Sequence, residues 1–272
     1  MNRPASIAAF FDLDGTLLLP PSLEWRFISY LLWQDKLGTS NILRWLACAG
    51  FSLRHGPRQA FDANKQYLAG LAESLVEDWM KSWGASESNP STPKFFDEGP
   101  SRIEWHQSQN HRVFLVSGTL APLAKCAANH LPGNVQVIAT ELATCVTAAK
   151  SSGGNIREEN PHPPIWTGEI RGEHVVGPAK SRALHRTAVQ HELHLSKCYA
   201  YGDSWADRAL LETVGFPEAV NPSGPLAHLA KKRDWPVSHW GATKAVYGKT
   251  SSRFDSAGLL RKTTTATENF RR

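Results

Sequence analysis

Cysteine is scarce in this sequence, and the four cysteines lie far from one another, at Cys48, Cys126, Cys145 and Cys198. No pair has the CxxC spacing that zinc ribbons and redox motifs require, and thiols this distant do not suggest a dense disulfide framework. The pattern is typical of a protein from a reducing compartment, so we expect a cytoplasmic protein.

Long hydrophobic runs are also missing. The apolar segment 7–11 lacks the charged n-region and the length of a signal peptide, and it leads directly into acidic residues. The longest apolar stretches, 28–33 and 43–53, are too short or too interrupted to span a bilayer. We therefore expect neither a cleaved signal nor a membrane-spanning segment.

Most of the chain has little net charge. The whole sequence carries +5, but ten of its 30 basic residues and only three of its 25 acidic residues fall in the last 43 positions. The body is therefore slightly acidic, which argues against a nucleic-acid partner for it. We expect residues 246–272 to form a solvated, disordered basic tail. Contact of this tail with phosphate groups of a membrane or a nucleic acid is the alternative.

Short apolar runs alternate with segments of helical periodicity, which is typical of an α/β fold with a parallel sheet. Strands are expected at 7–13, 113–116, 135–139, 198–202 and 219–220, and the segments 142–146 and 165–170 are expected to form a hairpin. Helices are expected at 122–129, 178–193 and 205–214. Residues 22–83 form a helical block, and 84–100 form a linker rich in Ser, Pro and Gly.

Two acidic side chains, Asp12 and Asp14, directly follow the first expected strand, and Gly15 follows them. In an open parallel sheet, ligands bind at this carboxyl end of the strands. A turn at Asp14 would bring both carboxylates to one site, where one can attack and the other can move protons. Such a pair also attracts Mg²⁺, which prefers oxygen ligands. The alternative is an ordinary Asp-Gly turn in which Asp14 caps a helix.

Three later segments add groups suited to phosphate chemistry. Ser117-Gly118-Thr119 follows a strand, where a hydroxyl and backbone N–H groups can hold phosphate oxygens. Lys180 lies at the opening of a helix, where a cation is badly placed against the helix dipole but well placed for an anion. Asp203 and Asp207 follow another strand and form a second acidic pair. Each segment also has an ordinary structural explanation, but their order and their strand-end positions favour a site.

Together these segments resemble the four motifs of the haloacid dehalogenase (HAD) superfamily, namely Phe11-Asp12-Leu13-Asp14-Gly15-Thr16, Ser117-Gly118-Thr119, Lys180 and Gly202-Asp203-Ser204-x-x-Asp207. The helical block after the first motif is similar to subfamily IB, the branch that contains phosphoserine phosphatase. The resemblance covers about residues 5–240. It implies a Rossmann-like core at 1–20 and 100–245, a helical cap with linker at 21–99, and Mg²⁺-dependent hydrolysis of a small phosphomonoester.

The resemblance also implies a role for each matching acidic residue. Asp12 would attack phosphorus and become an aspartyl-phosphate. Asp14 would protonate the leaving alcohol and then take a proton from water. The Asp12 carboxylate, the Asp14 backbone carbonyl and Asp203 would hold Mg²⁺.

The remaining motif residues would serve the phosphoryl group. Ser117, the Gly118 N–H and Lys180 would stabilise its charge during transfer, and Asp207 would support Lys180 or the metal. Two departures concern the substrate. Ala206 stands where phosphoserine phosphatases usually carry an amide residue, and Glu24 lies slightly too far along to match their substrate-selecting Glu.

Two other functions fit the same fold. A cap resting on a lipid surface would make the protein a phosphatase of phospholipid head groups, which the apolar helices and the basic tail favour. Loss of catalysis would leave a silent regulatory module. Four polar side chains near one interhelical turn are either solvated or face the leaving group of the substrate, namely Arg54, His55, Arg58 and Lys65.

Overall fold

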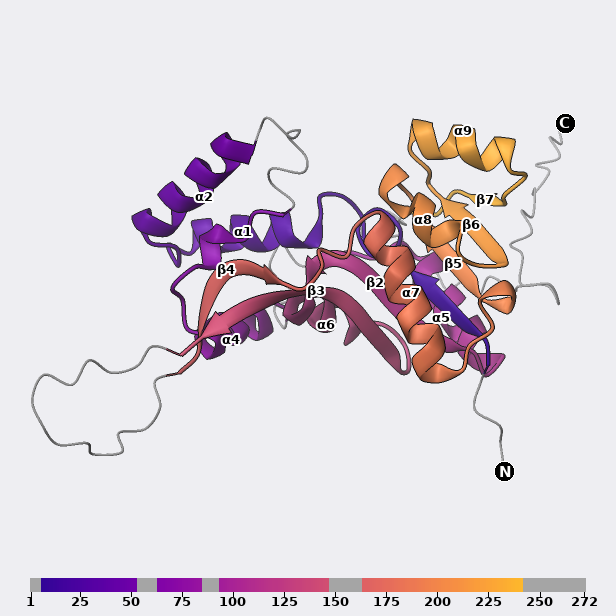
Figure 1. Cartoon of the computed structure of the whole chain (residues 1–272), viewed down its shortest axis with the longest axis horizontal. Coiled ribbons are helices and arrows are strands. Elements are labelled where there is room, and N and C mark those ends of the chain that lie inside the picture. Colours follow the sequence, from indigo (N-terminus) through magenta and orange to yellow (C-terminus); the bar gives the residue numbers. More distant parts are fainter. Residues whose placement is uncertain (1–5, 53–62, 85–92, 147–162, 242–272) are drawn as a thin grey trace, which may run out of the picture. The chain divides into compact units, whose positions relative to one another are not determined.

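A seven-stranded sheet with the order β4-β3-β2-β1-β5-β6-β7 forms the centre of the protein (Figure 1). The computed structural model describes residues 6–52, 63–84, 93–146 and 163–241. All neighbouring strands are parallel except β3 and β4, which are antiparallel. The expected α/β architecture is confirmed. The strands are β1 (Ala8–Phe11), β2 (Arg112–Leu120), β3 (Val135–Cys145), β4 (Ile165–Arg171), β5 (Tyr199–Gly202), β6 (Phe216–Val220) and β7 (Val237–Ser238).

Strand β1 lies in the middle of the sheet because all four of its residues are apolar and buried. Alternate side chains enter two different hydrophobic clusters, as the two-residue period of a strand requires. Ala9 and Phe11 belong to one cluster, and Ala8 and Phe10 belong to the other. Burial on both faces is typical of parallel sheets covered by helices. It holds the end of β1, and the two acids after it, in a rigid position.

The helical block between β1 and β2 contains α1 (Leu23–Trp33), α2 (Thr39–Ser52), the short helix η2 (Gln66–Leu68) and α4 (Glu73–Gly84). Helix α1 starts after Ser22, whose hydroxyl accepts a hydrogen bond from the Trp25 N–H, and its buried face includes Leu23, Phe27 and Leu31. The expected helical periodicity is therefore confirmed here. Over the described ranges, no helix has both the length and the apolar character needed to cross a membrane.

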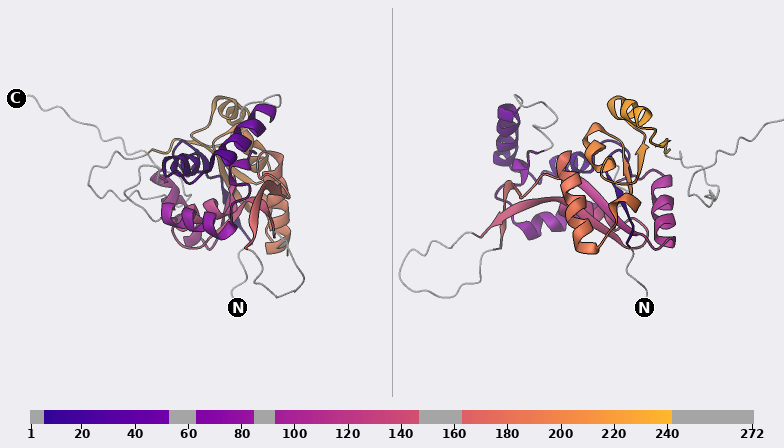
Figure 2. Two further views of the ribbon diagram at one scale, coloured as in Figure 1. Left: turned by 90° about the vertical axis from the view of Figure 1, so that its left-hand side faces the viewer. Right: turned by 45° about the vertical axis from the view of Figure 1, so that its right-hand side comes forward.

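Strand β3 is longer than expected. Residues 135–139 and 142–146 were expected as two separate strands, but one strand runs from Val135 to Cys145. Its first half pairs with β2 and its second half pairs with β4, so it continues past the edge of the core (Figure 1 and Figure 2). The helical block is attached to β4, the partner of this extension. The Gly70 N–H donates to the Trp166 carbonyl at 2.8 Å, and the Trp166 N–H donates to the Leu71 carbonyl at 2.9 Å.

Several other expectations need correction. Ser117-Gly118-Thr119 lies inside β2, because the strand keeps pairing with β3 beyond an irregularity, and α6 (Ala121–Ala128) begins afterwards. The predicted linker includes the start of α5 (Glu98–Ser108). The predicted helix 205–214 is only η4 (Trp205–Asp207) and α8 (Arg208–Leu211). Helices α7 (Pro178–His191) and α9 (Gly224–Lys232) and the short helix η3 (Leu195–Lys197) complete the fold. Arg54, His55, Arg58 and the basic tail lie outside the described residues.

Helix α5 carries a buried histidine, His106, that contacts a tyrosine of strand β5. The His106 side chain is 0% exposed, and its two ring nitrogens lie 2.8 Å from the Tyr201 hydroxyl and 3.0 Å from Nδ1 of His111. Tyr201 stacks on Phe11, with ring centroids 4.4 Å apart, and its carbonyl accepts a hydrogen bond from the Asp12 N–H. Burial, followed by repulsion from His111 and Arg102, lowers the pKa of His106 to about 2. His106 therefore stays neutral in the folded protein.

This histidine predicts a change in acid stability. In the unfolded chain its pKa returns to about 6.5, so the unfolded state binds a proton below that pH and the folded state does not. His106 therefore reduces the free energy of unfolding as pH falls, by about 2 kcal/mol between pH 7 and pH 5. H106Q should remove this loss. The free energy of unfolding of H106Q relative to that of wild type should therefore rise by about 2 kcal/mol when the pH is lowered from 7 to 5. Denaturant unfolding at both pH values measures it.

The exposed His130 provides the control. H130Q should follow the wild-type pH dependence, since this side chain is exposed to water in the folded protein as in the unfolded chain. Equal pH dependence of H106Q and wild type would contradict the assignment of a neutral buried His106.

Candidate active site

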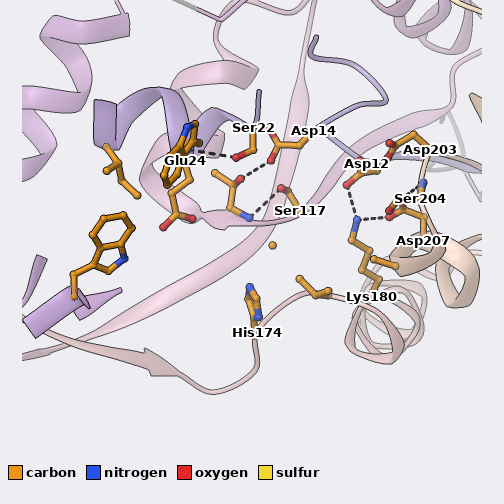
Figure 3. A pocket seen from close by; sticks show the side chains of 17 residues that line it. Asp12, Asp14, Ser22, Glu24, Ser117, His174, Lys180, Asp203, Ser204 and Asp207 are labelled. Carbon is orange, nitrogen blue, oxygen red and sulfur yellow. Dashed lines mark hydrogen bonds and ion pairs between the residues drawn. The ribbon is translucent and has the colours of Figure 1, made fainter. Parts of the chain in front are cut away.

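A cavity of about 420 Å³ opens where β1, β2 and β5 end. All seven residues that the sequence motifs nominated line it, namely Asp12, Asp14, Ser117, Gly118, Lys180, Asp203 and Asp207. Figure 3 labels all of them except Gly118. The carboxyl ends of parallel strands meet at one edge of the sheet, which explains why motifs far apart in the sequence converge here. The helical block contributes a second group of lining residues, Ser22, Glu24, Trp25, Ile28 and Trp45.

Asp12 is held rigidly at the end of β1. Its Oδ1 accepts a hydrogen bond from Lys180 Nζ at 2.5 Å, and its Oδ2 accepts one from the Thr16 hydroxyl at 3.1 Å. The turn that follows depends on Gly15, whose φ is +93°. A Cβ at this position would lie 2.3 Å from Oδ2 of Asp203, so only glycine allows this approach of the two segments.

Asp14 faces the same cavity but has different partners. Its Oδ1 accepts a hydrogen bond from the Leu23 N–H at 2.6 Å, and its Oδ2 accepts one from the Thr119 hydroxyl at 2.8 Å. The bond to Leu23 means that Asp14 also holds the start of α1, so the helix-capping alternative is correct in part. Burial raises the pKa of Asp14, although these hydrogen bonds oppose the shift. A carboxyl group with a raised pKa can carry a proton at higher pH than usual.

Lys180 is the cation of the site. It is buried in the first turn of α7, and it donates hydrogen bonds to Asp12 at 2.5 Å and to Oδ1 of Asp207 at 2.6 Å. Burial alone would lower the pKa of Lys180, but the attraction of the two carboxylates raises it. The lysine therefore stays protonated. Asp207 therefore contacts Lys180 directly.

The second acidic pair is placed by the turn after β5. Oδ2 of Asp207 accepts hydrogen bonds from the Ser204 N–H at 3.0 Å and the Ser204 hydroxyl at 2.8 Å, which fixes Asp207 against α8. The Asp203 backbone carbonyl accepts one from the Ser223 N–H at 2.7 Å. In contrast, Oδ1 of Asp203 is buried and has no hydrogen-bond partner among the described residues.

A divalent cation fits this acidic group. Carboxylate oxygens of Asp12, Asp203 and Asp207 lie within 4.8 Å of one another. Burial, followed by repulsion from Asp207, raises the pKa of Asp12 to about 7. Burial and then repulsion from Asp12 raise the pKa of Asp203 to about 8. A bound cation would relieve this repulsion and would give Oδ1 of Asp203, which accepts no hydrogen bond from the described residues, a partner. The available ligands are all oxygen atoms, which suit Mg²⁺. The side chain of Asp14 is not part of the group.

The opposite wall is formed by the end of β2 and the segment before α7. The Ser117 hydroxyl accepts a hydrogen bond from the Thr119 N–H at 3.1 Å. At Gly118, an added Cβ would lie 2.5 Å from a Val176 methyl carbon and 3.3 Å from Nε2 of His174. Glycine is therefore required here for close packing of the two segments. This packing brings His174 to the cavity (Figure 3).

Two ionisable lining residues were not assigned a role from the sequence. His174 was not nominated at all, since a lone histidine six positions before Lys180 belongs to no motif. Glu24 was set aside because its position did not match the family pattern, but it does line the cavity. Its Oε2 accepts a hydrogen bond from Lys65 Nζ at 2.5 Å, and its Oε1 accepts one from the Tyr67 hydroxyl at 2.9 Å. Lys65 is 1% exposed, so it is neither solvated nor part of the lining.

Comparison with known proteins gives consistent results. The family model described as haloacid dehalogenase-like hydrolase matches residues 9–212. The "Inhibition of morphological differentiation protein" of Streptomyces azureus is 29% identical over 85% of this chain and 77% of its own length. "Phosphoserine phosphatase SerB1" of Mycobacterium tuberculosis is 27% identical over 85% of this chain and 70% of its own. A crystal structure of a protein of unknown function from Bordetella pertussis has the same fold, with a TM-score of 0.66, 23% identity, and coverage of 86% of this chain and 98% of its own.

The three-way contact of Lys180 predicts a stability effect. K180M removes the cation that separates Asp12 from Asp207 and leaves two buried carboxylates facing each other. Breaking a buried ion pair by removing one partner costs about 3–5 kcal/mol in free energy of unfolding, and denaturant unfolding at pH 7 should show such a loss. K125M, at an exposed lysine of α6, is the matched control and should stay close to wild type. A loss as small as that of K125M would mean that Lys180 does not hold the two acids.

Proposed function

The chain belongs to the haloacid dehalogenase-like hydrolase family, and we propose that it is a Mg²⁺-dependent phosphatase acting on a phosphomonoester through an aspartyl-phosphate intermediate. The observation that carries this proposal is the convergence of Asp12, Asp14 and Lys180 in one cavity, with a different environment for each carboxyl group. A phosphatase of this type needs one acid as nucleophile and a second as proton carrier.

Asp12 is the nucleophile in this proposal. Lys180 and Thr16 fix its two carboxylate oxygens, so its orientation toward an incoming phosphorus atom is set before substrate binds. The ammonium group of Lys180 lies beside the attacking oxygen and offsets negative charge on the transferring phosphoryl group. Ser117 and the backbone of Gly118 line the wall where the other phosphoryl oxygens would lie.

Asp14 is the general acid and base. Its raised pKa allows it to hold a proton, which it gives to the oxygen of the leaving alcohol when the phosphorus–oxygen bond breaks. The same carboxylate then takes a proton from the water that attacks the aspartyl-phosphate at phosphorus, which releases phosphate and restores Asp12. Hydrogen bonds from Leu23 and Thr119 keep its side chain pointed at the cavity during both steps.

Asp12 and Asp203 are the proposed side-chain ligands of the metal, together with the backbone carbonyl of Asp14. The fit rests on the bare Oδ1 of Asp203 and on the raised pKa values of both acids. When bound, Mg²⁺ would supply positive charge for the phosphate oxygens and would keep Asp12 ionised. Asp207 lies in the same acidic group, but it already accepts hydrogen bonds from Lys180 and Ser204.

We propose that the substrate is a small phosphorylated metabolite. The name of the SerB1 relative makes phosphoserine the first compound to test. The core motifs contact only phosphate and metal, which every phosphomonoester offers, so the choice of leaving group lies with the residues from the helical block. Ala206 lines the cavity at the position where an amide is usual in phosphoserine phosphatases, which leaves room rather than a hydrogen-bonding group there.

Replacement of the nucleophile tests the mechanism. D12N should lower the turnover of a generic aryl phosphate at least about a hundredfold, the scale on which single catalytic groups act. The amide is close in shape to the carboxylate, so the fold should persist. D78N, at an exposed acid of α4, is the matched control and should keep wild-type turnover. A phosphate-release assay in which D12N retains more than about a hundredth of wild-type turnover contradicts the aspartyl-phosphate route.

Metal dependence is tested by binding as well as by activity. Mg²⁺ should raise the melting temperature of the wild-type protein by several degrees, since a ligand that binds only the folded state stabilises it. EDTA should reverse this shift and stop turnover of the aryl phosphate. D203N should lose most of the shift, because it removes the least satisfied carboxylate. An equal shift in D203N, or full turnover in EDTA, would exclude the proposed metal site.

A further inference from the structure

The cavity has two ends of different chemistry. Its core end holds four carboxyl groups and Lys180, which suit a phosphate and a cation. Its other end is formed by five residues of the helical block, namely Ser22, Glu24, Trp25, Ile28 and Trp45. Three of them, Trp25, Ile28 and Trp45, are apolar or aromatic. The Trp25 and Trp45 rings lie 6.1 Å apart. Figure 3 shows Ser22 and Glu24 on the opposite side of the pocket from Asp12, Asp203 and Asp207.

The one acidic side chain at this second end is already neutralised. Both oxygens of Glu24 are engaged, one by Lys65 and one by the Tyr67 hydroxyl. Lys65 is buried, so its charge is not screened by water and acts directly on Glu24. The ion pair carries no net charge. An ammonium group of a substrate would therefore meet a carboxylate whose charge is already balanced.

The neighbouring histidine adds no charge either. Burial, followed by repulsion from Lys65, lowers the pKa of His174 to about 4, so its ring is neutral at physiological pH. It can offer or accept a hydrogen bond but cannot balance a substrate carboxylate. Among the described residues that line the helical-block end, no side chain has an uncompensated charge.

We propose that this end of the cavity selects an uncharged leaving alcohol with an apolar or aromatic body, and that it disfavours the zwitterionic alcohol of an amino-acid phosphate. The inference rests on the proposed phosphatase function, because it takes the phosphate to lie at the core end. A charged group placed against Trp25, Ile28 and Trp45 would lose its hydration without gaining a partner, whereas an alkyl or aryl group would gain contact.

Two substrates of nearly equal size test the proposal directly. Propyl phosphate ends in a methyl group at the position where 2-aminoethyl phosphate carries an ammonium group. The wild-type kcat/KM should be at least about tenfold higher for propyl phosphate, since leaving a charge unpaired in an apolar site costs more than a tenfold factor in binding. Equal values, or a preference for the ammonium compound, would overturn the proposal.

A binding measurement separates this inference from the proposed function. The matching phosphonates, propylphosphonate and 2-aminoethylphosphonate, cannot be hydrolysed, and their dissociation constants in Mg²⁺ can be measured by calorimetry. Tighter binding of propylphosphonate supports the proposed selectivity even if no phosphomonoester is turned over, in which case only the phosphatase proposal fails. Turnover of phosphomonoesters with tighter binding of the aminophosphonate overturns the selectivity alone.

The aromatic wall is tested with a matched pair of tryptophans on α1. Trp25 lines the cavity and is 48% exposed, whereas Trp33 is 74% exposed and does not line it. W25A should lower the ratio of kcat/KM for hexyl phosphate to that for methyl phosphate about tenfold through lost apolar contact. W33A should leave that ratio unchanged. An unchanged ratio in W25A would overturn the role of this wall.

An apolar alcohol can belong to a free metabolite or to a lipid, and a third arm distinguishes these sources. Dihexadecanoyl phosphatidic acid in phosphatidylcholine vesicles is compared with hexyl phosphate, which stays monomeric. Faster turnover of the vesicle substrate, reduced in W33A, identifies a lipid source. Faster turnover of hexyl phosphate identifies a free metabolite. If 2-aminoethyl phosphate is turned over faster than both the vesicle substrate and hexyl phosphate, the proposal is wrong.

Discussion

The position of one buried lysine between two buried carboxylates is the constraint on which the site depends. Lys180 comes from the first turn of α7, Asp12 follows β1 and Asp207 follows β5, so their contact joins three separate segments of the chain. Buried like charges this close would otherwise repel one another strongly. The lysine compensates only part of the cost of placing these acids together, because burial and the remaining repulsion still raise the pKa values of Asp12 and Asp203. The site therefore favours uptake of positive charge, either as protons or as the proposed cation.

The fold supplies the rigidity that this arrangement requires. Strand β1 is buried on both faces, and Tyr201 on the neighbouring strand stacks against Phe11 while its carbonyl binds the Asp12 N–H. His106 in turn holds the Tyr201 hydroxyl from α5. The orientation of Asp12 therefore depends on Phe11, Tyr201 and His106, which do not line the cavity. Gly15 and Gly118 act from the side of the cavity, because each allows two segments to approach more closely than a Cβ would permit.

The sequence was sufficient to predict the core and the charged end of the cavity, but not its other end. Asp12 and Asp203 directly follow strands with clear periodicity, and the rule that ligands bind at the carboxyl ends of parallel strands places them together. Lys180 lies in the first turn of a helix, where a cation is well placed for an anion but not for the helix dipole. No such rule relates Glu24 to Lys65, since their contact depends on how α1 and the segment before η2 pack. His174 reaches the cavity beside Gly118, where an added Cβ would lie 3.3 Å from its Nε2, and no sequence motif marks this contact. The extension of β2 to Leu120 was not predicted because Ser-Gly-Thr after a strand is typical of a helix start, and pairing with β3 overrides that local preference.

The extended hairpin of β3 and β4 has a mechanical consequence for access to the cavity. The segment around Gly70 and Leu71 is joined to Trp166 of β4 by backbone hydrogen bonds. The helical block is therefore connected to the sheet through β4 as well as through the chain itself. A motion that widens the entrance must either break those bonds or carry the hairpin with it. The pairing of β3 with β4 is irregular between Leu142 and Thr144, beyond the last residue that β3 shares with β2. Such an irregularity bends the strand locally, and this one lies outside the strands that hold Asp12 and Asp203.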